Sequence, residues 1–283
     1  VMTAIDQPAR QSLVMELVGR EHVPSAVGLN SVSFNGARIV GPAIAGVLIA
    51  RVGLFPGFFL NALAFVFSIA MLARIPGRRP VPRLGEATLV EDMLEGIGYA
   101  LRTPAVRFIL SLQIVLSFCV FNFSVYVPLV ARQVLGMGAE GFGLLMTCLG
   151  VGALAAGFSL GGLRALTLST IAGALAVACA GLVGLSFARV LWLAALLLMT
   201  VGFSGTMVMA GCNTSLQLGA PDALRGRVMS LYSLLSGGIF PIGAFWVGFV
   251  SEHWGVQRAF LVNGMLGLLA VAALTLWRRT RPR

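Results

Sequence analysis

Residues 28–46 read GLNSVSFNGARIVGPAIAG and lie inside a long apolar segment. Wound as an α-helix, this stretch places four small residues one turn apart on a single side: Ser33, Ala37, Gly41 and Ala45. Small side chains let two helices approach closely in a bilayer, where hydrophobicity does not drive helices together. Pro42 removes one backbone donor and bends the helix. The stretch predicts a membrane helix that packs closely against another helix, although the spacing alone also fits an ordinary packed helix.

The composition of the whole chain excludes a soluble globular protein. Hydrophobic residues make up 58% of the 283 residues and charged residues only 11%, against about 25% charged in soluble domains. A spanning helix needs about 20 mostly apolar residues. Eight segments meet this requirement: 25–50, 54–73, 108–131, 141–163, 168–188, 190–216, 228–251 and 257–277. We therefore expect an all-α, polytopic membrane helical bundle.

The basic residues predict the orientation of this bundle. All 20 are arginines. Threading the chain back and forth through the eight segments puts fifteen on one side, four on the other, and Arg38 inside a helix. Because cytoplasmic loops carry the excess of basic residues, we expect both ends of this chain to be cytoplasmic. The net charge of +10 then reflects topology and anionic lipid headgroups, and we assign no nucleic-acid partner.

Residues 74–107 form the longest polar stretch and predict a linker. Three prolines interrupt its first part, and apolar residues then recur every four positions: Leu89, Met93, Ile97 and Leu101. This pattern predicts an amphipathic helix that lies at the cytoplasmic membrane surface and that Pro104 ends. The chain is thereby divided into residues 1–73, 74–107 and 108–283.

The two membrane parts contain an internal repeat. RVGLFPGFFLNA at 51–62 and HWGVQRAFLVNG at 253–264 share glycine, phenylalanine, leucine and asparagine in the same order. Pro42 and Pro241 occupy matching places in their segments, and one period of six spans separates the copies. The repeat predicts two six-helix halves, the first without its first four helices. Residue 1 is valine and no cleavable leader precedes the first span, so we expect no signal peptide and a start inside a longer protein.

The opening stretch also carries a family resemblance. The pattern of Gly28, Ala37, Gly41-Pro42 and Ala45-Gly46 resembles the antiporter motif in the fifth transmembrane helix of major facilitator superfamily exporters, with Ala37 and Ala45 replacing two glycines. The polar text at 6–21 resembles the connection into that helix in the drug:proton antiporter branch, which includes macrolide and siderophore exporters. The resemblance implies the major facilitator fold, helices five to twelve, and export of a drug-like compound or siderophore in exchange for protons.

Ionisable groups inside membrane spans are the first candidates for coupling transport to protons. All 10 acidic residues fall in connections or at span ends, so the resemblance places the proton-carrying acid in the missing helices. Arg38 lies about 20 Å deep at 1.5 Å per residue, and burying it costs about 2.5–3.5 kcal/mol unless a partner offsets the charge. We expect it to pair with a carboxylate, helix-end carbonyls or an anionic substrate group. Snorkelling or a purely structural pairing is the alternative.

The resemblance implies that segments 108–131 and 190–216 line a central substrate cavity. Their polar, aromatic and sulfur-containing candidates are Gln113, Phe118, Asn122, Tyr126, Thr200, Phe203, Ser204 and Met207. Such a mixture suits amphipathic compounds, although hydroxyls bonded to their own backbone are an equal alternative. Which side of 108–131 faces the cavity stays open: Gln113, Ser117 and Ser124 share one side, and Phe118, Asn122 and Tyr126 share the other.

Two further segments complete the expected transport machinery. The glycine-rich segment 141–163, with Gly152 and Gly157, is expected to pack against the Gly41 helix. PDALRGRV at 221–228 resembles the family's loop before the eleventh helix, which implies gating contacts for Asp222, Arg225 and Arg227.

The remaining expectations concern partners and rival functions. The spans contain no cluster of His, Asp, Glu and Cys, so we expect no metal, no cofactor and no enzymatic activity. The expected partners are a small-molecule substrate, protons and membrane lipids, and we expect a monomer in the bacterial inner (plasma) membrane. A lipid or lysolipid flippase of the same fold is the alternative function, and a non-transporting membrane scaffold also stays open.

Overall fold

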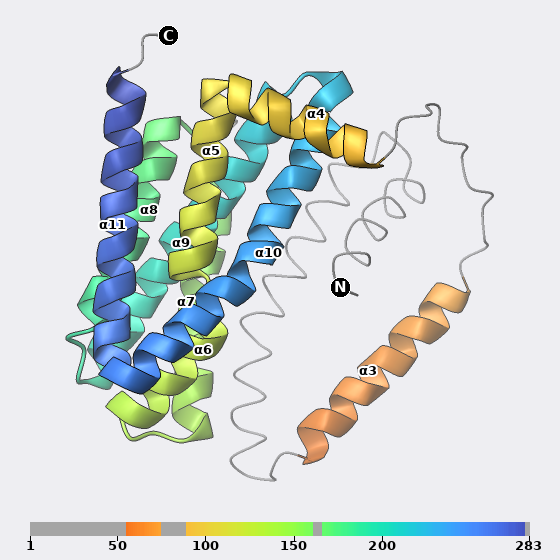
Figure 1. Ribbon diagram of the computed structural model, residues 1–283. Coiled ribbons are helices and arrows are strands. Elements are labelled where there is room, and N and C mark those ends of the chain that lie inside the picture. Colours follow the sequence, from red (N-terminus) through yellow and green to blue (C-terminus); the bar gives the residue numbers. More distant parts are fainter. Residues whose placement is uncertain (1–54, 75–88, 161–165, 281–283) are drawn as a thin grey trace.

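The computed structural model describes residues 55–74, 89–160 and 166–280, and every regular element in these ranges is helical (Figure 1). In chain order the elements are α3 (Phe55–Ala73), α4 (Leu89–Arg102), α5 (Pro104–Val115), the π-helix η2 (Leu116–Val120), α6 (Phe123–Leu129), the π-helix η3 (Val130–Val134), α7 (Ala139–Leu160), α8 (Leu168–Leu185), α9 (Leu191–Gly219), α10 (Asp222–Trp254) and α11 (Val256–Thr280).

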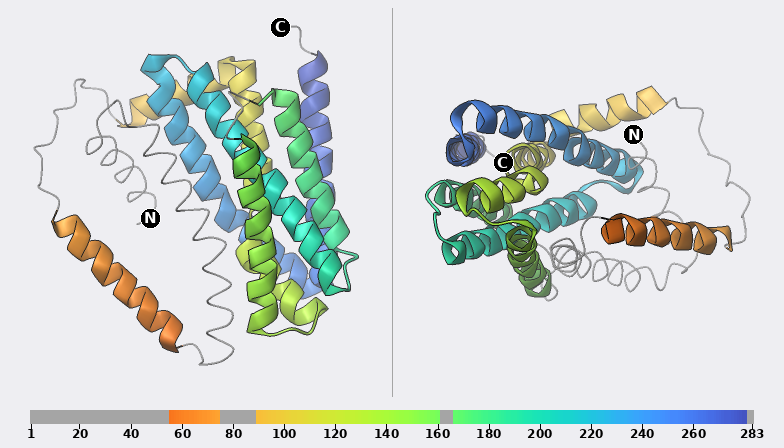
Figure 2. Two further views of the ribbon diagram at one scale, coloured as in Figure 1. Left: turned by 180° about the vertical axis from the view of Figure 1, so that it is seen from behind. Right: turned by 90° about the horizontal axis from the view of Figure 1, so that it is seen from below.

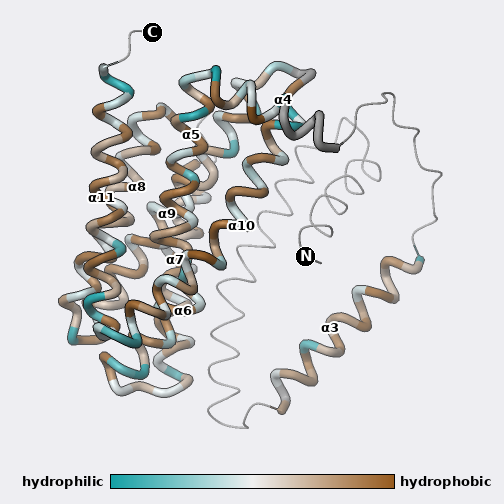
Figure 3. The backbone as a smooth tube through the Cα atoms, in the orientation of Figure 1, coloured by the Kyte–Doolittle hydropathy of each residue, from teal (hydrophilic) through white to brown (hydrophobic). Residues whose placement is uncertain are grey.

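Six helical runs in the described ranges are long and apolar enough to cross a membrane. They are Pro104–Val134, Ala139–Leu160, Leu168–Leu185, Leu191–Gly219, Leu224–Trp254 and Val256–Thr280. Hydrophilic residues gather toward the ends of these helices, and apolar residues dominate their middles (Figure 3). The prediction of an all-α membrane bundle is therefore confirmed. The segment expected at 25–50 lies outside the described residues, and the three-part division of the chain stays a prediction.

The corner between α4 and α5 sets where the bundle begins. α4 ends at Arg102, and Pro104 is the first residue of α5, four positions before the expected start at 108. Thr103 between them is extended (φ −97°, ψ 105°), the conformation that a residue before proline prefers. Proline suits a first helical position because the N–H that it lacks would have no helical partner there. α4 crosses one end of the bundle as a result (Figure 1).

The helices of the bundle touch through glycines. A Cβ atom at Gly152 of α7 would overlap the Met199 carbonyl of α9, and one at Gly202 of α9 would overlap the Leu149 carbonyl of α7. Each glycine therefore lets the other helix approach to backbone contact. Gly152 serves this α7–α9 contact inside the bundle, and the expected packing of segment 141–163 against the Gly41 helix stays a prediction, because Gly41 lies outside the described residues. Gly157 is exposed with open space around it.

α3 stands apart from the bundle, on the side opposite to α11 (Figures 1 and 2). Large apolar side chains cover its surface: Phe58 is 70% exposed and Phe65 is 62% exposed. Its apolar part, Gly57–Ala73, is shorter than the six spans. A helix of this composition needs lipid or other helices around it, and its role as the expected span 54–73 stays a prediction.

Candidate substrate-binding site

The first span of the bundle, Pro104–Val134, is interrupted near its middle. At Phe121 and Asn122 the backbone leaves the regular helix, with ψ angles of 14° and 36°. The Phe121 N–H donates to the carbonyl of Leu116, five residues back, at 3.0 Å, as in a π-turn. π-turns are frequent at functional sites, and interrupted membrane helices often line binding sites. We call Phe121–Asn122 the break, and it is the leading candidate for a binding site.

The break is held by a side chain and by a close helix neighbour. The Asn122 amide Nδ2 donates to the Phe118 carbonyl at 2.6 Å, while Asn122 Oδ1 is buried without a hydrogen-bond partner. Gly243 of α10 packs onto the same place, because a Cβ there would lie 2.5 Å from the Phe118 oxygen and 2.9 Å from Asn122 Nδ2. Asn122 itself is fully buried, so it supports the break from inside the bundle.

Around the break, the uncovered residues of this span recur every three or four positions. Ile114, Phe118, Phe121, Ser124 and Pro128 are exposed or half-buried. Of the two predicted sides, one contributes Ser124 and the other Phe118 to these uncovered positions. Which side faces a substrate cavity stays a prediction.

The other predicted residues of this span are enclosed. Gln113 Nε2 donates to Ser117 Oγ at 3.2 Å, and both side chains are fully buried. Gln113 Oε1 has no hydrogen-bond partner. A buried amide oxygen without a partner is uncommon and costly, but Gln113 lies inside the bundle, and its role in substrate binding stays a prediction.

Tyr126 belongs to a polar cluster that joins three helices. Its hydroxyl donates to the Cys119 carbonyl at 3.0 Å and accepts from Asn263 Nδ2. Asn263 Oδ1 accepts from Trp246 Nε1 at 3.0 Å, and the Tyr126 ring stacks on Phe260 with centroids 4.7 Å apart. Tyr126 is only 1% exposed. The cluster ties α6 to α10 and α11, and it gives the repeated asparagine of the sequence a structural role.

The predicted side of α9 points away from the break. The Thr200 hydroxyl donates to the Leu196 carbonyl at 3.0 Å and the Ser204 hydroxyl to the Thr200 carbonyl at 2.6 Å, which is the alternative that the sequence left open. Phe203 and Met207 lie on the same side and are half-buried. The roles of these four residues as substrate contacts stay predictions.

The opposite side of α9 contacts the interrupted span. A Cβ at Gly205 would lie 3.6 Å from the Phe121 ring. Cys212, seven residues later, points its Sγ at the Ile109 carbonyl at 3.8 Å. Gly205 and the half-buried Met209 next to it are therefore the α9 residues nearest to the break, and sequence spacing did not select them.

α10 contributes a second exposed surface, and none of its residues was predicted from the sequence as part of a site. Exposed residues recur every three or four positions along it: Ser230, Ser233, Leu234, Gly237, Gly238, Pro241, Ile242 and Phe245. The buried side of α10 carries Gly243 at the break and Tyr232, whose hydroxyl donates to the Met209 carbonyl at 3.2 Å. In the view from below, α10 and α7 extend toward the side of α3 (Figure 2). The small residues Ser233, Gly237 and Pro241 are the signal that could have marked this face.

The residues expected in a gating loop lie instead in the first two turns of α10. This expectation was wrong about the structure, because Pro221 caps a helix that already begins at Asp222. Arg225 Nε donates to the Gln217 carbonyl of α9 at 2.9 Å. Arg227 forms an ion pair with Glu95 of α4, and a Cβ at Gly96 would lie 3.1 Å from Arg227 Cβ. α4 is thereby fastened to the start of α10, and gating roles for these residues stay predictions.

Comparison with known proteins identifies the family. The major facilitator family described as "Transmembrane secretion effector" matches residues 1–282. The chain belongs to this transporter family. The match confirms the resemblance drawn from the sequence and shows that the chain is not of an enzyme family.

Curated relatives of this major facilitator chain include named siderophore and drug transporters. It is 24% identical to the staphyloferrin A transporter of Staphylococcus aureus, over 94% of this chain and 66% of the relative. It is 27% identical to the multidrug efflux pump Tap of Mycolicibacterium fortuitum, over 93% of this chain and 67% of the relative. It is 26% identical to the enterobactin exporter EntS of Escherichia coli, over 94% of this chain and 66% of the relative. The chain thus spans about two thirds of the length of these relatives, and their names do not favour the lipid flippase.

Some expected parts of the transporter lie outside the described residues. The antiporter motif, Gly28, Ala37, Gly41, Pro42, Ala45 and Gly46, and the intramembrane Arg38 are among them. Within the described ranges, no group of three or more His, Cys, Asp or Glu side chains could hold a metal ion. The cysteines in these ranges are unpaired, and three of them, Cys119, Cys179 and Cys212, are buried.

Proposed function

We propose that this protein is a secondary active exporter of small amphipathic molecules, either a siderophore or a drug-like compound. The observation that carries the proposal is the family match over residues 1–282, together with relatives named as a staphyloferrin A transporter, a multidrug efflux pump and an enterobactin exporter. The surface around the break suits such cargo, because half-buried Phe118 and Phe121 lie beside backbone groups and the hydroxyl of Ser124.

Transport would proceed by alternating access between two halves. The bundle that begins at Pro104 would form one half, residues 1–73 would belong to the other, and residues 74–103 would connect them. The uncovered sides of α10 and of the interrupted span would face the opposite half. The Glu95–Arg227 pair would fasten the connecting segment to α10 as the halves rock. A central site between two such halves is the arrangement that repeat-built transporters use.

Proton exchange would provide the driving force. Among the described side chains, the acids lie at the ends of the six spans or outside them: Glu140 and Glu252 are exposed, and Glu95 of α4 is ion-paired with Arg227. We therefore place the proton-carrying group outside the described spans, with Arg38 as its partner or as the contact of an anionic substrate. We further propose a monomer in the bacterial plasma membrane, with both ends of this chain on the cytoplasmic side and the arginine-rich helix ends facing the cytoplasm.

The test is substrate accumulation in an efflux-deficient bacterial host that expresses the intact protein. We expect lower accumulation of a panel drug or of a catecholate or carboxylate siderophore than with empty vector, and loss of this difference with a protonophore. Phe121→Ala should raise accumulation several-fold, whereas Leu266→Ala, on the exposed side of α11, should not. Well-folded protein that lowers the accumulation of no compound would refute the exporter proposal, and export that survives the protonophore would refute the proton exchange.

A further inference from the structure

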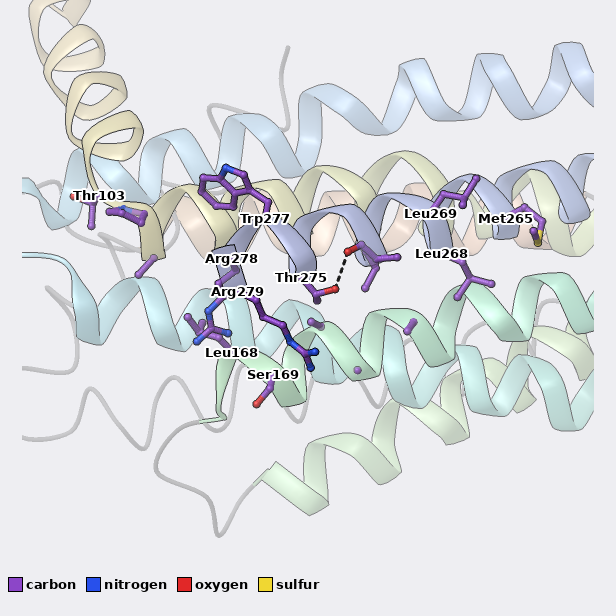
Figure 4. A pocket seen from close by; sticks show the side chains of 17 residues that line it. Thr103, Leu168, Ser169, Met265, Leu268, Leu269, Thr275, Trp277, Arg278 and Arg279 are labelled. Carbon is purple, nitrogen blue, oxygen red and sulfur yellow. Dashed lines mark hydrogen bonds between the residues drawn. The ribbon is translucent and has the colours of Figure 1, made fainter. Parts of the chain in front are cut away.

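A long groove runs over the outer side of the bundle, between α8 and α11, and neither residue of the break lines it. Its volume is about 1300 Å³, larger than the about 300–1,000 Å³ of ordinary small-molecule pockets. The groove is deep because the side chains on its floor are short: Ala172, Gly173, Ala176 and Ala272 line it. The corner at Thr103 and Pro104 lies at one end (Figure 4).

The two ends of the groove differ in chemistry. Arg278 and Arg279 line one end, where Figure 4 shows them beside Leu168 and Ser169 at the start of α8. Toward the other end the lining is apolar, with Leu268, Leu269 and Met265. Among the described residues, no acidic side chain lines the groove. The N-terminus of α8 adds positive potential at the arginine end. The groove thus has a positively charged end, which we call the mouth, and the rest of the groove is apolar.

Aromatic rings hold this charged end in place. The Arg278 guanidinium lies 5.1 Å from the centroid of the Phe108 ring, and the Arg107 guanidinium lies 4.4 Å from the Trp277 ring. Trp277 itself lines the groove. Contacts between cations and aromatic faces restrain the arginines without neutralising their charge. The mouth therefore keeps a net positive charge that attracts an anion.

The dimensions of the groove match one leaflet of a bilayer. From Met265 to Arg279, 14 residues of α11 span about 21 Å at 1.5 Å per residue. One leaflet with its headgroups is about 20–22 Å thick, half of the total bilayer thickness. The groove would face lipid, because apolar side chains at it are exposed: Leu269 is 64% exposed and Leu276 62%. Its charged mouth lies near Thr103, at the α4 end of the bundle, and would then be at the depth of headgroups.

We infer that the groove binds one anionic glycerophospholipid of the leaflet at the arginine-rich end. The phosphodiester would lie between Arg278, Arg279 and the start of α8, and an acyl chain would lie over Gly173 and Ala176. Basic pockets between membrane helices on the cytoplasmic side are suited to anionic headgroups. The lipid would fill the groove between α8 and α11, which small side chains leave open. The inference does not depend on the exporter proposal, because it concerns a lipid-facing site away from the break.

The test measures thermal unfolding of the intact protein, delipidated in a neutral detergent, with added phosphatidylglycerol or phosphatidylcholine. Saturating phosphatidylglycerol should raise Tm by about 5 °C, the shift expected from a ligand well above its Kd, and phosphatidylcholine should raise it by less than half as much. R278Q/R279Q should lose the phosphatidylglycerol-specific part. R258Q, which removes an exposed arginine from the opposite end of α11, should keep it.

A second pair of variants tests the apolar part of the groove without changing charge. Gly173 is exposed and has no atom within 4 Å of a Cβ placed on it, so alanine fits the fold there, and the longer side chain of leucine would extend into the groove that Gly173 lines. Gly173→Leu should reduce the phosphatidylglycerol shift by more than half, whereas Gly173→Ala should leave it unchanged. Equal shifts for the two lipids, an equal loss in R258Q, an unchanged shift in Gly173→Leu, or a full shift with inorganic phosphate alone would each overturn the inference.

Discussion

Gly243→Ala is expected to disturb the break directly. The new Cβ would lie 2.5 Å from the Phe118 carbonyl oxygen and 3.1 Å from its Cα. Ordinary contact needs about 3.4 Å, so α10 or the interrupted span must move by about 0.9 Å in a closely packed interior. Gly248→Ala is the matched control, because it adds the same methyl group five residues later on α10, where nothing lies within 4 Å.

The expected magnitude comes from comparing these two variants. Overpacking of this kind costs about 1–3 kcal/mol, and both variants gain up to about 1 kcal/mol from replacing a helical glycine. The gain cancels in the comparison, so Gly243→Ala should be less stable than Gly248→Ala by about 1–3 kcal/mol. For a bundle of this size the difference corresponds to about 2–12 °C in Tm.

A thiol-reactive fluorophore provides the assay, since buried Cys119, Cys179 and Cys212 become accessible only on unfolding. Transport by the same variants should fall for Gly243→Ala and stay near wild type for Gly248→Ala, because only the first shifts the Phe118–Asn122 region. Equal unfolding temperatures for the two variants would show that Gly243 does not press against the break. The structural basis of the candidate site would then be wrong.

Three further changes have expected outcomes. Asn263→Ala removes the amide that bridges buried Tyr126 and half-buried Trp246 and should lower stability by about 1–3 kcal/mol, seen as a lower Tm; an unchanged Tm would show that the bridge contributes nothing. Gly255→Ala should cost about 1–3 kcal/mol, because Gly255 adopts φ 86° and ψ 157° in open space, and an unfolding temperature equal to wild type would contradict this. Arg227→Gln should change stability by less than about 1 kcal/mol, because the pair is exposed, at 28% for Arg227 and 58% for Glu95; a double-mutant cycle with Glu95→Gln that gives a larger coupling would be the contrary result.

The membrane spans could be predicted from the sequence because length and hydropathy define a membrane helix. Each segment expected between residues 108 and 277 has a helical counterpart in the described bundle. Two helices begin earlier than the spans predicted from hydropathy, because polar residues extend each helix beyond its apolar part. α10 begins at Asp222 and not at 228 because Arg225 and Arg227 find partners in α9 and α4. α5 begins at Pro104, where the chemistry of proline outweighed the hydropathy signal.

The candidate site was harder to predict, for two physical reasons. Phe121 and Asn122 are neither glycine nor proline, so no local signal marks the break, and the close contact of Gly243 with it joins residues more than 100 positions apart in the sequence. α9 is apolar on all sides, and in a membrane both lipid and protein neighbours are apolar, so hydropathy cannot tell which side faces inward. Thr200 was predicted as a substrate contact on side-chain chemistry alone, and Gly205, which lies nearer to the break, was not predicted.

The composition of an exposed face distinguishes lipid from a missing helix neighbour. The exposed face of α11 carries long apolar side chains such as Leu266, Leu269 and Leu276, which fill the irregular space between acyl chains. The exposed face of α10 mixes the small residues Ser233, Gly237 and Pro241 with the large apolar Leu234, Ile242 and Phe245. Small residues at regular spacing permit close approach of another backbone, and the uncovered α11 residues named above include none. Under the proposed function, the other half would therefore pack on α10, and the break behind Gly243 would lie on the side that faces it.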